Sequence, residues 1–275
     1  METESAKIGQ TGVGFMGNFG TKHLTGLLWV FSTIAVVLTV LLWIKKKYHK
    51  GEGFDRKVIA GAALFIWAWE IVKTIYIFNS TDYGPVGHYT AYMLPFHICS
   101  MGLYAFWILG FRPGKVADFI KPFAFAIMLL VTMIILIIPD SSGILGDEYV
   151  ADWSWQIKNI LPYQSFSYHG TLVFVPLYMV LSGYYRPKIA DFWKSEVTLL
   201  VVAVIAFVLN KLLHVTDFMM LEFGWGNPFA YLIEDQYGLY LLLLAGITTL
   251  GSALVLGIAQ GLSALGSRRR QRKTT

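Results

Sequence analysis

The chain of 275 residues contains one cysteine, Cys99, two positions after His97 in the apolar segment LPFHICSM at 94–101. A thiol becomes nucleophilic when a neighbouring cation or base favours its thiolate form. On a helix, His97 and Cys99 would point to different faces, so a base would come from another segment. His169, in SYHGTL, is the candidate. The sequence therefore predicts a Cys99–His169 catalytic pair, with a small buried apolar residue as the alternative role for Cys99.

Further polar side chains occur in apolar segments at a depth similar to that of this pair. An ionisable group at the centre of a membrane span costs about 2.5 to 3.5 kcal/mol even on the mildest scale, which makes each one a functional candidate. Since lipid exposure is unfavourable, we expect these groups to face a water-accessible cavity open to the outside. No comparable set is expected in the inner half of the spans. The supporting or substrate-binding candidates are Glu70, Lys73, His97, Asn210, Lys211, His214 and Asp217.

Several of these candidates have spacings with a structural meaning. Glu70 and Lys73 are three residues apart on one helix face and can form an ion pair, either as part of the site or as a purely structural pair. Lys211 and His214 repeat that spacing. Glu70 or Asp217 could orient the base, as a third group does in nucleophile–base arrangements. His23 and His49 are expected at the surface.

Composition shows what must position these residues. Hydrophobic residues make up 56% of the chain and charged residues 14%, which is typical of an integral membrane protein. An apolar helix of about 20 residues crosses the bilayer. We predict an all-α fold with seven transmembrane helices at 24–44, 58–78, 91–110, 119–138, 166–184, 197–216 and 237–260.

The basic residues predict the orientation. Most of the 22 lysines and arginines follow the first, third, fifth and seventh spans. By the positive-inside rule the N-terminus is outside and the C-terminus cytoplasmic. The chain then comprises a polar extracytoplasmic segment at 1–23, a seven-helix domain at 24–260 and a basic cytoplasmic tail at 261–275, in a multi-pass protein of the cell membrane.

Four segments resemble the YwaF-type integral membrane proteins of bacteria, distant relatives of a eukaryotic multi-spanning family of phospholipid acyltransferases. They are the Glu70–Lys73 pair, LPFHICSM at 94–101, YHG at 168–170 and LNKLLHVTDFMML at 209–221. The family usually has asparagine followed by tyrosine where this chain has Asp217 and Phe218. The resemblance to the acyltransferase branch implies an acyl-enzyme on Cys99 with His169 as base, and membrane phospholipid as the partner.

Three functions are compatible with these residues. The first is a lipid acyltransferase or transacylase that uses Cys99 and His169. The second is a transporter whose Glu70, Lys73, His214 and Asp217 bind a polar solute or relay protons. The third is a seven-helix sensor or scaffold, which no motif supports.

Metal, cofactor and nucleic-acid functions are not predicted. No HxxxH, HExxH or CxxC spacing occurs within a helix, and the sequence contains no phosphate-binding glycine loop. The net charge of +5 comes from short basic clusters between apolar runs, and the tail SRRRQRK is typical of a topology signal or a contact with anionic lipid.

Overall fold

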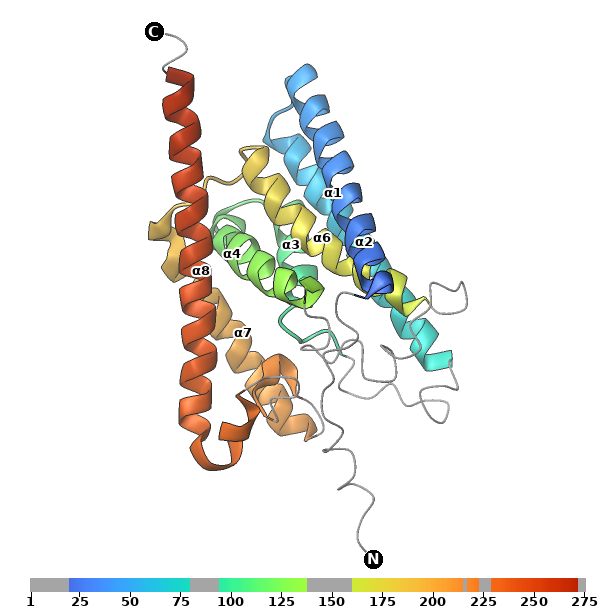
Figure 1. Ribbon diagram of the computed structural model, residues 1–275, viewed down its shortest axis with the longest axis vertical. Helices are drawn as coiled ribbons and strands as arrows, with labels where there is room; N and C mark the ends of the chain where they lie inside the picture. The colour runs from blue at the N-terminus through green and yellow to red at the C-terminus, as the bar shows by residue number, and fades with distance from the viewer. Residues whose placement is uncertain (1–19, 80–93, 138–159, 215–216, 223–228, 272–275) are drawn as a thin grey trace, which may run out of the picture.

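The structure is a computed structural model that describes residues 20–79, 94–137, 160–214, 217–222 and 229–271 (Figure 1). The described residues form seven α-helices and contain no strand, so the all-helical prediction is confirmed for this part of the chain. The α-helices are α1 (Thr21–Lys47), α2 (Glu52–Asn79), α3 (Met101–Phe111), α4 (Lys115–Ile137), α6 (Leu161–Leu181), α7 (Phe192–Leu213) and α8 (Ile233–Gln271). Three short 3-10 helices are η6 (Ile189–Asp191), η7 (Phe218–Met220) and η8 (Ala230–Leu232).

Two helices form the centre of the bundle. α6 packs against α1, α2 and α4, while α4 also packs against α3, α7 and α8. In Figure 1, α1 and α2 lie at one edge of the molecule and α8 at the other, with α4 and α6 between them. Most side chains of α6 are buried by its neighbours. A helix enclosed by other helices can therefore carry polar residues without exposing them to lipid.

Five segments are long and apolar enough to cross a membrane: His23–Lys47, Glu52–Asn79, Lys115–Ile137, Ile189–Leu213 and Ala230–Ala264. They correspond to the first, second, fourth, sixth and seventh predicted spans. α6 is 21 residues long but is not among the five, and its first half contains Gln164, Ser165 and His169. α3 is apolar but has only 11 residues, about 16 Å of helix.

The third predicted helix, 91–110, differs from the structure. Within the described residues it starts only at Met101, and the segment from Leu94 to Ser100 forms bends and turns. Pro95 prevents an unbroken helix from running through this position, because its ring lacks an N–H and clashes with the preceding helical turn. The N–H groups of Ser100 and Met101 bond to the carbonyls of His97 and Ile98, three residues earlier. His97 and Cys99 therefore lie in a tight turn that leads into α3, and helical spacing does not set their directions.

Candidate functional site

The Glu70–Lys73 pair is present in the structure. Lys73 Nζ lies 2.7 Å from Glu70 Oε1, three residues earlier on α2. The Glu70 side chain is only 7% exposed and that of Lys73 19%. Removing one partner of such a buried pair is costly, because it leaves the other charge without compensation.

Cys99 is buried beside this ion pair. The Lys73 ammonium and the Glu70 carboxylate both lie within Coulombic range of the thiol. The Tyr168 hydroxyl, on α6, lies within the same range of Cys99 and Glu70. Three elements therefore meet here: α2, the turn before α3, and α6. We call Glu70, Lys73, Cys99, Tyr168 and His169 the Cys99 cluster.

The imidazole of His169 is held in one orientation. Its Nδ1 lies 2.8 Å from the backbone carbonyl oxygen of Ser165, one turn earlier on α6. A carbonyl can only accept a hydrogen bond, so Nδ1 carries the proton and the Nε2 of the neutral ring carries a lone pair. That Nε2 is buried and has no hydrogen-bond partner within the part of the chain that the structure describes. His169 thus presents an unused proton acceptor inside the bundle.

Lys73 interacts electrostatically with both predicted catalytic residues. Its ammonium lies within Coulombic range of the His169 ring as well as of the Cys99 thiol. No hydrogen bond joins Cys99 to His169, and the ring packed against His169 is that of Tyr168, at 5.4 Å between centroids. Sequence reasoning missed Tyr168 because a tyrosine in an apolar helix is usually a packing residue.

His97 faces a different part of the bundle from His169. Its ring contacts the ring of Phe218 edge-on, with 5.2 Å between centroids. The neighbouring Phe96 contacts the same Phe218 ring at 5.5 Å. The turn that carries Cys99 is therefore packed against the segment that follows α7.

Asn210 and Asp217 bind backbone groups in that segment. Asn210 Oδ1 accepts the Phe218 N–H at 2.8 Å, and Asn210 Nδ2 donates to the Phe218 carbonyl at 3.1 Å. Asp217 Oδ1 accepts the N–H of Glu222 at 2.7 Å. Both side chains are almost fully buried. Their observed contacts shape the chain after α7, and we call this region the Phe218 corner.

Lys211 and His214 lie at the exposed side of the Phe218 corner. Lys211 Nζ pairs with Glu222 Oε1 at 2.6 Å, and its side chain is 53% exposed. His214 ends α7 with a left-handed backbone, φ 57°, and is exposed. Lys211 and His214 therefore do not share one face of a helix as expected, because α7 ends at Leu213.

A second buried ion pair, at the other ends of α1 and α2, was missed by the sequence analysis. Asp55 is 1% exposed, and its carboxylate accepts from Lys45 Nζ at 2.5 Å and from the Tyr178 hydroxyl at 2.8 Å. Lys45 also donates to the Ser182 carbonyl at 2.7 Å. This ion pair lies at the connector between the first two predicted spans, outside the segments 24–44 and 58–78. Lys45 and Asp55 flank the short connector between α1 and α2, and a basic–acidic pair around a helical hairpin is the signal that could have identified it.

The chain belongs to the TMEM164 family, whose family model matches residues 18–256. That range includes every residue of the Cys99 cluster and of the Phe218 corner. The apolar helices and the family together identify a membrane protein. No curated protein and no solved structure matches the chain.

Proposed function

We propose that this TMEM164-family protein transfers acyl groups between membrane lipids, with Cys99 as the nucleophile and His169 as the general base. The observation that carries the proposal is the His169 ring: Nδ1 is committed to Ser165, and Nε2 is buried with its acceptor function unused. A general base needs such a fixed tautomer. The resemblance of the 94–101 and 168–170 segments to phospholipid acyltransferases supports the same pair.

The reaction needs no redox partner. His169 Nε2 takes the Cys99 proton while Sγ bonds to the ester carbonyl carbon of a donor phospholipid. The tetrahedral intermediate expels the lysophospholipid oxygen, which takes the proton from His169 and leaves a thioester. An acceptor hydroxyl then gives its proton to His169 and attacks the thioester, and the sulfur leaves and is reprotonated.

The surroundings of Cys99 suit this chemistry in two ways. The Lys73 ammonium lies within Coulombic range of both the thiol and the imidazole, so it would stabilise the negative charge on sulfur. Because no hydrogen bond joins Cys99 to His169, the proposed proton transfer requires a water molecule or the lipid hydroxyl between them, as some general bases use.

The orientation predicted from the sequence determines on which side of the membrane the proposed site would lie. Seven crossings with the N-terminus outside would place the Cys99 cluster toward the outer side, where outer-leaflet phospholipid rather than cytoplasmic acyl-CoA would be the donor. A Cys99→Ala chain with a new cysteine at Lys50 tests the orientation in intact cells. Protection of Lys50→Cys from a membrane-impermeant maleimide is expected, and labelling without permeabilisation would reverse the orientation.

Thioester formation tests the chemistry. The full chain in nanodiscs is incubated with phosphatidylcholine carrying an alkyne-tagged acyl chain, and hydroxylamine-sensitive label on the protein is measured. We expect label on the native chain, none on Cys99→Ala and at least a hundred-fold slower labelling of His169→Gln. The exposed-residue control His49→Asn should keep the native rate. An unlabelled native chain, or equal label on Cys99→Ala, overturns the proposal.

A further inference from the structure

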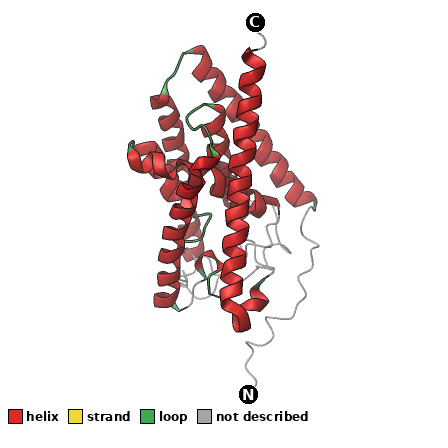
Figure 2. Cartoon of the chain, turned by 90° about the vertical axis from the view of Figure 1, so that its left-hand side faces the viewer, coloured by secondary structure: helices red, strands yellow, loops and turns green. Residues whose placement is uncertain are grey.

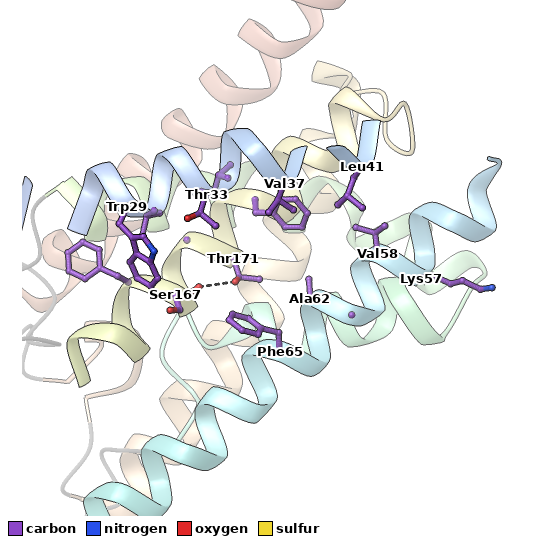
Figure 3. A pocket seen from close by; sticks show the side chains of 16 residues that line it. Trp29, Thr33, Val37, Leu41, Lys57, Val58, Ala62, Phe65, Ser167 and Thr171 are labelled. Atoms are coloured by element: carbon purple, nitrogen blue, oxygen red, sulfur yellow. Dashed lines mark hydrogen bonds between the residues drawn. The ribbon is translucent and has the colours of Figure 1, made fainter. Parts of the chain in front are cut away.

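A long apolar groove lies on the opposite edge of the bundle from α8, where α1, α2 and α6 meet. Its volume is about 480 Å³, within the range of roughly 300 to 1,000 Å³ typical of small-molecule sites. Figure 3 shows Trp29 at one end of the groove and Lys57 at the other, with Val37 and Leu41 of α1 along one wall. The groove is therefore apolar along its length and basic at one end.

The groove carries few hydrogen-bonding side chains: besides Lys57, they are those of Trp29, Thr33, Ser167 and Thr171. Thr171, which lines its floor, donates its hydroxyl to the Ser167 carbonyl at 2.8 Å and so has used its donor within α6 (Figure 3). The remaining lining side chains are mainly Val, Leu, Ile and Phe. A polar solute would lose its hydration here with little compensation, whereas a hydrocarbon chain has no such cost.

The hollow is made partly by a missing side chain. A Cβ built at Gly61 would meet no atom within 4 Å, so the space above this residue of α2 is open. On the far side, α1 and α6 are in close contact at Gly170, where a Cβ would lie 2.9 Å from Val30 Cγ1. The two helices thus close the back of the groove, while its front, at Gly61, stays accessible.

The length of the groove matches one leaflet of a bilayer. From Trp29 to Leu41 the α1 wall covers about 18 Å at 1.5 Å per residue. Half of a hydrocarbon core of about 30 Å is roughly 15 Å. A groove of this length, open along a membrane-spanning surface, fits one extended acyl chain.

Lys57 identifies the rest of the ligand. Its side chain is exposed and, among the described residues, takes part in no ion pair or cation–π contact. In Figure 3 it extends beyond the Val58 end of the groove. The ammonium group of a lysine binds phosphate groups as a point charge. An apolar channel that ends at an unpaired ammonium is complementary to a lipid tail that ends at a phosphate.

We propose that the α1–α2–α6 groove is a binding site for one membrane phospholipid, with an acyl chain between Trp29 and Leu41 and the phosphate at Lys57. This site is separate from the Cys99 cluster: Gly170 and Thr171 face the groove, whereas His169 is buried among the core residues. Lipid binding here does not depend on acyl transfer.

The test uses the full chain in nanodiscs that contain a phosphatidylglycerol with a photoactivatable diazirine in its acyl chain. After irradiation, cross-linked peptides are identified by mass spectrometry. We expect cross-links concentrated in the 29–41 and 57–65 segments. Gly61→Leu, which fills open space, should reduce them at least five-fold, and the matched control Gly257→Leu, on an equally open face of α8, should not.

Three further variants separate headgroup binding and catalysis from occupancy of the groove. Lys57→Gln should reduce cross-linking at least two-fold while Lys57→Arg retains it, and Cys99→Ala should leave it unchanged. Cross-links spread evenly over the lipid-facing helices, or equal labelling of Gly61→Leu and the native chain, would overturn the site. Elution at the native gel-filtration volume confirms for each variant that loss of labelling is not loss of fold.

Discussion

The Asn210 side chain binds both backbone groups of Phe218, accepting its N–H at 2.8 Å and donating to its carbonyl at 3.1 Å. One amide thus replaces the backbone partners that Phe218 lacks beyond the end of α7. The Phe218 ring in turn contacts His97. Asn210 therefore supports, through Phe218, the turn that carries Cys99.

Replacing Asn210 with alanine should destabilise the protein by about 1 to 3 kcal/mol, because two buried backbone groups lose their partner. The melting temperature of the detergent-solubilised chain measures this loss. Asn79→Ala is the control, since Asn79 also donates its amide to a carbonyl but is exposed. Equal melting temperatures for Asn210→Ala and Asn79→Ala would contradict the supporting role.

Asp55→Ala should cost about 3 to 5 kcal/mol, since it leaves the partly buried Lys45 ammonium without its carboxylate. The double variant Lys45→Met with Asp55→Leu removes both charges and should recover much of that loss. Asp118→Ala, whose carboxylate pairs with Lys121 but is 68% exposed, should change stability by less than about 1 kcal/mol. Chemical denaturation in mixed micelles compares the four proteins, and an Asp55→Ala protein as stable as Asp118→Ala would disprove the prediction.

Gly110→Ala should loosen the packing of α3 on α2. A Cβ at Gly110 would lie 2.7 Å from the backbone nitrogen and Cα of Ala60, so one helix must move. Overpacking of this kind costs about 1 to 3 kcal/mol. Gly257→Ala, in open space on α8, should be neutral or slightly stabilising because alanine favours a helix. A melting temperature of Gly110→Ala at or above that of Gly257→Ala would show that the helices separate without cost.

Lys73 should control the reactivity of Cys99. Since Cys99 is the only cysteine in the chain, the rate of its modification by a small methanethiosulfonate reports on one thiol. Lys73→Met should slow that rate at least ten-fold, and Lys73→Arg should restore most of it. Glu70→Gln with Lys73→Met removes both charges of the ion pair and should remain slow. A fast double variant would show that the unpaired Glu70 carboxylate, and not the missing cation, caused the effect.

The lengths of the apolar segments were enough to predict most helices, and residue spacing within one helix predicted one contact. The segments 24–44, 58–78, 119–138 and 197–216 overlap α1, α2, α4 and α7, because apolar length is set by the membrane itself. The Glu70–Lys73 pair also followed from spacing within one helix.

Contacts between distant segments could not be predicted in the same way. His23, expected at the surface, is 1% exposed and donates from Nε2 to the Leu136 carbonyl at the end of α4, 2.8 Å away. The paired hydrogen bonds of Asn210 likewise depend on a loop that returns to its helix. Asn210 and Asp217 were predicted to lie near Cys99 because the three residues have a similar predicted depth in the membrane. Depth does not specify which side of the bundle a side chain faces.

The last helix is longer than the membrane requires. α8 is interrupted at Gln236 (φ −138°, ψ 48°), and the helix from there to Gln271 is about 52 Å long, whereas a bilayer with its headgroups is roughly 40 to 45 Å thick. Figure 2 shows it along nearly the whole height of the molecule. Its final turns, which contain Arg268, Arg269 and Arg270, therefore continue the helix beyond the length that crosses the bilayer.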